Sequence, residues 1–227
     1  MVNLKINNIP VSVPEGTTIL EAARSVGIRI PTLCYLKEIN AIGACRICVV
    51  EVKGARSMVA ACVYPVAEGM EVTTNSEAVI KARKTTLELI LSDHQKKCLS
   101  CIRSTNCELQ NLANEYGCDA TAFEGATNEF QPDTSTDWLI RDNNKCILCR
   151  RCVAVCKHVQ EVGVISANKR GFSTNIDVAF QNGLENAGCV ACGQCINACP
   201  VGALYEKSEI EKVKSFLRDP GKVVVVG

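Results

Sequence analysis

The chain has few aromatic side chains, no excess of charge and no long apolar run. Aromatic residues make up 4% of the 227 residues, and 25 basic residues against 24 acidic ones leave a net charge of +1. Nucleic-acid recognition needs a basic surface and usually aromatic side chains that stack on bases, so this composition argues against it. The longest apolar stretch, residues 58–64, is much shorter than a membrane-spanning helix. We therefore expect neither nucleic-acid nor membrane partners.

The N-terminus also lacks the apolar core of a secretory signal, because Asn3, Lys5 and Asn7 interrupt it. The sequence therefore predicts a cytoplasmic protein. In that reducing compartment, a chain with 16 cysteines is more typical of a metal protein than of a disulfide-bonded one. Bound metal would also contribute to folding.

The strongest signal is an internal repeat of cysteines. The spacing C-x2-C-x2-C-x3-C occurs twice, and each cysteine of the second copy lies 43 residues after its counterpart. In bacterial two-cluster ferredoxins this run supplies three ligands to one [4Fe–4S] cluster, and its last cysteine binds the other cluster. The predicted ligand sets are Cys146, Cys149, Cys152 and Cys199 for one cluster, and Cys189, Cys192, Cys195 and Cys156 for the other. Pro200 follows the second run as expected, whereas Lys157 takes the place of proline after the first.

A third group of cysteines lies near the N-terminus. Its members are Cys34, Cys45, Cys48 and Cys62. The elements predicted around them are a hairpin at 2–13, a helix that begins after Thr18, and strands at 49–53, 57–64 and 70–73. This order is typical of a β-grasp domain. Four cysteines spread over such a domain favour a [2Fe–2S] cluster, with a zinc site as the alternative.

The last group contains a histidine and leaves one cysteine in excess. Its compact part consists of His94, Cys98, Cys101 and Cys107, while Cys118 lies further along the chain. The spacing favours a [4Fe–4S] cluster in which a neutral imidazole of His94 is the fourth ligand. In the alternative, Cys118 is the fourth ligand and His94 is a surface residue.

Several longer motifs resemble a known family. These are DHQKKCLSC, NCELQNLA, CILCRRCVAVC, RGF and CVACGQCINACPVGALYEK. They resemble the N-terminal iron–sulfur region of [FeFe] hydrogenases, especially the multisubunit NAD(P)-linked electron-bifurcating type. The large iron–sulfur subunit of respiratory complex I and NAD-linked formate dehydrogenases share the arrangement. The resemblance implies that His94 is a cluster ligand and that the N-terminal group holds a [2Fe–2S] cluster.

Together these observations predict an α+β protein with three cluster domains. The predicted parts are a β-grasp [2Fe–2S] ferredoxin domain at 1–76, a small helical [4Fe–4S] domain with one histidine and three cysteine ligands at 77–118, a linker at 119–138, a bacterial-type two-[4Fe–4S] ferredoxin domain at 139–208, and a C-terminal helix and strand at 209–227. The C-terminal strand is expected at 222–226, where four valines follow one another.

We find no glycine-rich phosphate loop and no set of residues for acid–base catalysis, so no catalytic residue is predicted. The expected function is an iron–sulfur electron-transfer subunit of an oxidoreductase, with one [2Fe–2S] and three [4Fe–4S] clusters. It would pass single electrons to or from a partner that binds FMN or FAD and NAD(P).

The resemblance implies that this partner is a flavin- and NAD(P)-binding subunit of complex I type. A small [2Fe–2S] subunit and ferredoxin are further candidates. A complete [FeFe] hydrogenase continues into a hydrogen-activating domain, which the sequence does not show before residue 227. Two alternatives remain: the N-terminal part of a complete [FeFe] hydrogenase or NAD-linked formate dehydrogenase, and a cluster-bearing scaffold or redox sensor.

Overall fold

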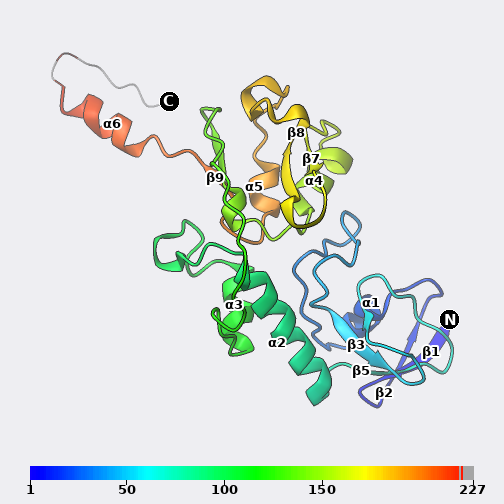
Figure 1. Cartoon of the computed structure of the whole chain (residues 1–227). Coiled ribbons are helices and arrows are strands. Elements are labelled where there is room, and N and C mark those ends of the chain that lie inside the picture. Colours follow the sequence, from blue (N-terminus) through cyan, green and yellow to red (C-terminus); the bar gives the residue numbers. More distant parts are fainter. Residues whose placement is uncertain (220, 222–227) are drawn as a thin grey trace.

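The computed structural model describes residues 1–219 and 221; the strand predicted at 222–226 lies outside this part. Figure 1 shows the N-terminal sheet and the helices α2 (Glu77–Ser92) and α3 (Glu108–Glu115) in the lower half of the molecule. The cysteine-rich C-terminal half lies above them. In the described residues, no helix is both long and apolar enough to cross a membrane.

The N-terminal part is a five-stranded sheet with the order β2-β1-β5-β3-β4. Its strands are β1 (Val2–Ile6), β2 (Ile9–Val13), β3 (Val49–Val52), β4 (Val59–Ala60) and β5 (Glu71–Thr73). Strands β1 and β5 are parallel, whereas the other neighbours are antiparallel. The predicted hairpin is confirmed. Its two-residue turn, Asn7-Asn8, has positive φ at both positions, which asparagine tolerates well.

Helix α1 (Ile19–Ser25) covers this sheet. The Thr18 side chain accepts a hydrogen bond from the Glu21 amide at the helix start, as the sequence predicts. Buried α1 residues such as Leu20 and Ala23 share a hydrophobic core with the strands. Strand β4 is shorter than predicted, because the amides of Val63 and Tyr64 turn back to the Ala60 carbonyl instead of extending the strand.

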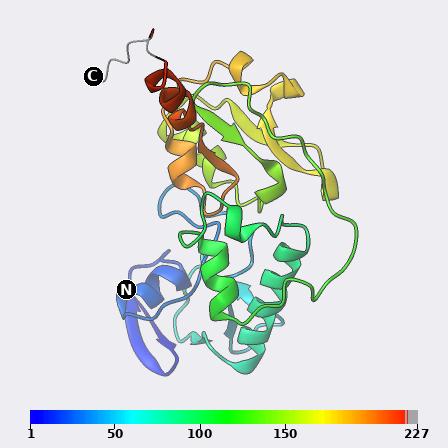
Figure 2. The same cartoon turned by 90° about the vertical axis from the view of Figure 1, so that its left-hand side faces the viewer.

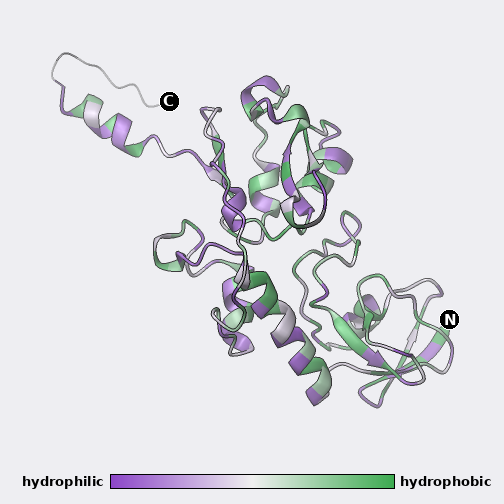
Figure 3. Ribbon diagram, viewed as in Figure 1, coloured by the Kyte–Doolittle hydropathy of each residue, from purple (hydrophilic) through white to green (hydrophobic). Residues whose placement is uncertain are grey.

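Helices α2 and α3 belong to a second core that joins the predicted domains. Leu87 of α2 and Leu109 of α3 pack in it with Ile47 from the N-terminal part and Leu139 and Val201 from the C-terminal half. Figure 3 shows hydrophobic and hydrophilic bands alternating along α2, as expected for a helix buried on one face. The cysteine-containing segments of the three predicted domains are therefore packed against one another rather than joined only by a linker.

The C-terminal half contains two short antiparallel sheets that the sequence did not predict. They are formed by β6 (Leu139–Arg141) with β9 (Leu204–Glu206), and by β7 (Ile165–Asn168) with β8 (Asn175–Val178). The helices are α4 (Arg151–Ala154), which continues as a wider turn over Val155–Val159, α5 (Gln194–Ala198) and α6 (Ile210–Leu217). The buried Arg141 of β6 donates hydrogen bonds to the carboxylates of Asp133, at 3.0 Å, and of Asp177 in β8, at 2.6 Å. It thereby connects the two sheets.

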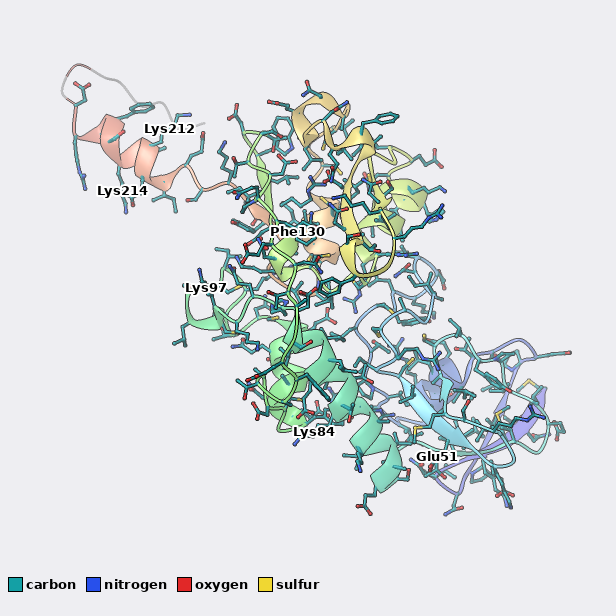
Figure 4. All side chains as sticks on the ribbon, in the orientation of Figure 1. Glu51, Lys84, Lys97, Phe130, Lys212 and Lys214 are labelled. Atoms are coloured by element: carbon teal, nitrogen blue, oxygen red, sulfur yellow. The ribbon has the colours of Figure 1, made fainter. Side chains whose placement is uncertain are left out.

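Residues 119–138 contain no helix or strand, but hydrogen bonds fix their path along one side of the molecule (Figure 2). Asn128 bonds the Asp93 carboxylate, and Phe130, labelled in Figure 4, exchanges two hydrogen bonds with Asn144. Helix α6, which carries the labelled Lys212 and Lys214, stands away from the rest of the chain (Figures 1 and 4).

Candidate metal centres

The four N-terminal cysteines come together beside the sheet. Cys34, Cys45 and Cys48 lie on the segment between α1 and β3, and Cys62 lies in the turn after β4; all four are buried. The thiols of Cys45 and Cys62 are neighbours of the Cys34 thiol, and Cys62 is also a neighbour of Cys48. The shortened β4 is what places Cys62 in this group.

The proximity of these thiols to one another strongly shifts their pKa values. Hydrogen bonds from Cys45 and Cys62 lower the pKa of Cys34 to about 2, with a smaller contribution from the Ala44 amide. The pKa values of Cys45 and Cys62 are raised, chiefly by their hydrogen bonds to Cys34. Four sulfurs that share protons in this way form a site suited to a group that replaces those protons with metal.

The compact histidine–cysteine set, which follows α2 in the sequence, lines one cavity. The cavity is lined by His94, Gln95, Cys98, Cys101, Arg103, Ser104, Cys107, Gln110 and Gly202. Burial lowers the pKa of His94 to about 4, with a further contribution from Lys145, so the imidazole is neutral at neutral pH. Its Nδ1 is buried and has no hydrogen-bond partner among the described residues. A buried nitrogen that lacks a partner fits a ligand position, because leaving such an atom unpaired is unfavourable.

Cys118 does not line this cavity. Its sulfur lies 4.0 Å from the Lys84 carbonyl oxygen on α2, and burial beside Glu88 raises its pKa. Of the two residues left open by spacing, the structure places His94, and not Cys118, beside Cys98 and Cys107.

Two further cavities separate the eight cysteines of the repeat. One is bordered by Cys146, Cys149, Cys152 and Cys199, and the other by Cys156, Cys189, Cys192 and Cys195. Each run thus lies with the last cysteine of the other run, which is the exchange expected for two-cluster ferredoxins.

The two cysteine runs also share the same backbone conformation at matched positions. Leu148 and Ala191 both have a φ of 54°, and Arg150 and Gly193, the next matching pair, have values of 60° and 70°. Left-handed backbone is unfavourable for residues other than glycine, so its recurrence at matched positions indicates a functional constraint. This conformation directs amides toward sulfur: the Leu148 N–H donates to Cys146 Sγ, with 3.4 Å between nitrogen and sulfur.

Burial strongly affects several of these cysteines. It raises the pKa values of Cys146 and Cys149 to about 12 and that of Cys195 to about 11. Free thiolates would therefore be unfavourable here, whereas a cationic iron core would stabilise them. No group of three or more His, Cys, Asp or Glu side chains within 1–219 and 221 is arranged to hold a single metal ion; the three predicted [4Fe–4S] sets border cavities instead.

The sequence analysis did not predict the polar contacts that join the candidate sites. Arg103, from the His94 cavity, donates hydrogen bonds to the carbonyls of Ile196 and Cys199 at 3.0 and 2.9 Å. Glu108, next to Cys107, forms a two-pronged ion pair with Arg151 at 2.6 and 2.9 Å. An arginine or a glutamate near a cysteine motif is too common for sequence alone to single out.

The three parts of the chain match three known domain families. Residues 1–77 match the 2Fe-2S iron-sulfur cluster binding domain, and residues 83–121 match the NADH-ubiquinone oxidoreductase-G iron-sulfur binding region. Residues 145–203 match the 4Fe-4S dicluster domain. The chain therefore has 2Fe–2S and 4Fe–4S cluster-binding domains in an α+β iron–sulfur fold.

Several known proteins are similar over most of the chain. NADP-reducing hydrogenase subunit HndD of Solidesulfovibrio fructosivorans is 45% identical over all of this chain and 40% of its own length. NADPH-Fe(3+) oxidoreductase subunit alpha of Geobacter sulfurreducens is 40% identical over 91% of this chain and 24% of its own length. The chain thus spans less than half of these relatives.

A solved structure extends the likeness to the fold. A chain of NAD+-reducing [NiFe]-hydrogenase in the H2-reduced state has a TM-score of 0.85 and 31% identity, over 91% of this chain and 88% of that one. The resemblance seen in the motifs is confirmed. The chain belongs to the family of iron–sulfur electron-transfer proteins of NAD(P)-linked hydrogenases and NADH-quinone oxidoreductases.

Proposed function

We propose that this chain conducts single electrons through one [2Fe–2S] and three [4Fe–4S] clusters in a multisubunit, electron-bifurcating NAD(P)-linked oxidoreductase. The proposed ligands are Cys34, Cys45, Cys48 and Cys62 for the [2Fe–2S] cluster; His94, Cys98, Cys101 and Cys107 for one [4Fe–4S] cluster; Cys146, Cys149, Cys152 and Cys199 for the second; and Cys189, Cys192, Cys195 and Cys156 for the third. We also propose the domain boundaries given above.

The observation that carries the proposal is that each of three cavities is bordered by one complete predicted [4Fe–4S] ligand set. Two of these sets combine cysteines that are distant in the sequence, since Cys199 joins Cys146 and Cys156 joins Cys189. The thiol contacts among Cys34, Cys45 and Cys62 support the fourth set. The parallel pairing of β1 with β5, with α1 packed on the sheet, supports a β-grasp fold for the N-terminal domain.

Bound clusters would supply one-electron redox chemistry at potentials set by ligand charge, hydrogen bonds and exposure. The protein controls all three. His94 is a neutral ligand where the other positions are thiolates, and amides such as those of Ala44 and Leu148 donate to cysteine sulfur. Buried cysteines such as Cys152 keep water from their site.

The names of the relatives support NAD(P)H as the electron donor or acceptor. We propose that a partner subunit of complex I type binds the nucleotide and a flavin, with a small [2Fe–2S] subunit and ferredoxin as further partners. A second candidate is that the chain is the electron-transfer region of a longer oxidoreductase chain. The greater length of HndD favours it, and extending the reading frame past residue 227 tests it.

Anaerobic reconstitution of the full chain tests the proposal. It should bind about fourteen iron atoms, as one [2Fe–2S] and three [4Fe–4S] clusters require. His94→Ala should lose about four iron atoms and one [4Fe–4S] signal in redox-titrated electron paramagnetic resonance (EPR), whereas Cys118→Ser should lose none. Loss of the signal in Cys118→Ser but not in His94→Ala would show that the ligand assignment is wrong.

A further inference from the structure

One buried side-chain amide joins two of the candidate sites. Asn40 Nδ2 donates hydrogen bonds to the Cys34 carbonyl at 2.7 Å and to the Cys149 carbonyl at 3.1 Å. Cys34 belongs to the proposed [2Fe–2S] site, and Cys149 belongs to a proposed [4Fe–4S] site 115 residues further along the chain. The two protons of a single nitrogen therefore connect the backbones of ligands to two different clusters.

The loop that carries Asn40 is built to hold it in this place. Its backbone exchanges two hydrogen bonds with Leu36, at 2.8 and 2.9 Å, which closes the loop into a tight turn. The intervening Lys37 and Glu38 are at the surface, whereas Asn40 is only 3% exposed. In Figures 1 and 2 this loop, in blue after α1, rises from the sheet toward the C-terminal half.

The chemistry of the contact is specific to an amide. Both acceptors are carbonyl oxygens, so the bridging group must present two N–H donors in a buried setting. A carboxylate of the same shape has no proton to donate and would face both carbonyls with negative charge. An apolar side chain would leave two buried carbonyls without this partner, which is unfavourable as well.

We propose that Asn40 is a positioning residue that sets the separation and magnetic coupling of the [2Fe–2S] cluster and the Cys149-ligated [4Fe–4S] cluster. It thereby sets the rate of electron transfer between them. Cys34 and Cys149 pack in the same hydrophobic core, but packing alone does not fix their register. The two hydrogen bonds do, because each is directional. This inference rests on the proposed function, since it requires both clusters.

Asn40→Asp and Asn40→Leu test the inference in the full chain loaded with clusters. Asn7→Asp is the matched control. The side-chain amide of Asn7 also donates a hydrogen bond, to the Thr74 hydroxyl at 2.7 Å, but this contact lies in a turn of the same domain that contains no cysteine. Each protein is first assayed for iron and sulfide. The microwave power that half-saturates the reduced [2Fe–2S] EPR signal is then measured before and after reduction of the [4Fe–4S] clusters.

In the unsubstituted protein and in Asn7→Asp, reducing the [4Fe–4S] clusters should raise the half-saturation power several-fold, because a nearby paramagnet speeds relaxation. In Asn40→Asp and Asn40→Leu most of this increase should disappear while iron content stays unchanged. A full increase in both Asn40 variants overturns the inference, and so does its absence from the unsubstituted protein. Loss of a cluster in both variants also overturns it, because Asn40 would then be needed for assembly. The proposed function itself fails only if the unsubstituted chain does not assemble the clusters.

Discussion

The Cα of Gly202 faces the sulfur of Cys101 so closely that a Cβ atom at position 202 would lie 2.5 Å from Cys101 Sγ. Gly202 follows the second cysteine run, whereas Cys101 belongs to the histidine–cysteine set, and both line the His94 cavity. The absence of a side chain at this position is therefore what lets two cluster-bearing segments meet.

Gly202→Ala should displace Cys101 and weaken the His94 site, because an extra methyl group in a filled site costs roughly 1–3 kcal/mol. Iron content should fall from about fourteen to about ten atoms per chain, with loss of one [4Fe–4S] signal. Gly125→Ala is the control, since a Cβ at Gly125 would meet no described atom within 4 Å. Full iron content in Gly202→Ala would show that Cys101 moves without cost.

His94→Cys should keep the cluster but lower its midpoint potential. A neutral imidazole makes the cluster less negative than a fourth thiolate would, so the native cluster accepts an electron more readily. Histidine-ligated Rieske centres have raised potentials for the same reason. An EPR-monitored redox titration of both proteins measures the shift. An unchanged or higher potential in His94→Cys would contradict a ligand role for His94.

Arg103→Gln should lower the potential of the cluster that Cys199 is proposed to bind. Burial raises the pKa of the Cys199 thiol, and the positive charge of Arg103, whose guanidinium donates a hydrogen bond to the Cys199 carbonyl, opposes that rise. A positive charge favours the reduced cluster. Removing the charge of Arg103 should therefore lower the midpoint potential by on the order of 59 mV, which corresponds to a tenfold change in a one-electron equilibrium.

Arg103→Lys separates charge from hydrogen bonding in this test, because it keeps the former and disturbs the latter. Its potential should lie near that of the unsubstituted protein. Arg56→Gln removes a charge from an exposed turn and should leave the potential unchanged. Equal shifts in the glutamine and lysine variants of Arg103 would attribute the effect to geometry.

Glu108→Gln should destabilise the contact between the helical segment and the C-terminal half. Arg151 is buried, with its side chain 6% exposed, and losing its carboxylate leaves a charge poorly compensated. We expect the free energy of unfolding to fall by about 1–3 kcal/mol. A larger loss is not expected, because Glu108 itself is half exposed.

Glu71→Gln provides the matched control. Glu71 and Glu108 side chains are both 48% exposed, but the partner of Glu71, Lys53, is 75% exposed. Glu71→Gln should therefore lower the stability of the protein much less than Glu108→Gln does. The urea concentration at which cluster absorbance is half lost compares the two variants. Similar midpoints would mean that the burial of Arg151 adds nothing to the pair.

The sequence by itself determined the local features. The Asn7-Asn8 turn, the Thr18 cap of α1 and the apolar spacing of α2 depend on residues a few positions apart, and the structure has all three. The cysteine spacing within each run is local in the same way, because the chain can wrap a cluster only with closely spaced ligands.

The tertiary structure decided how the sites meet. The length of β4 depends on a turn that carries Cys62, and the sheets β6–β9 and β7–β8 pair short strands with weak propensity of their own. The contacts of Asn40 with Cys149, and of Gly202 with Cys101, join segments about 100 residues apart. No local pattern encodes such contacts, because they arise only when the hydrophobic core that contains Cys34, Leu87 and Cys149 brings the segments together.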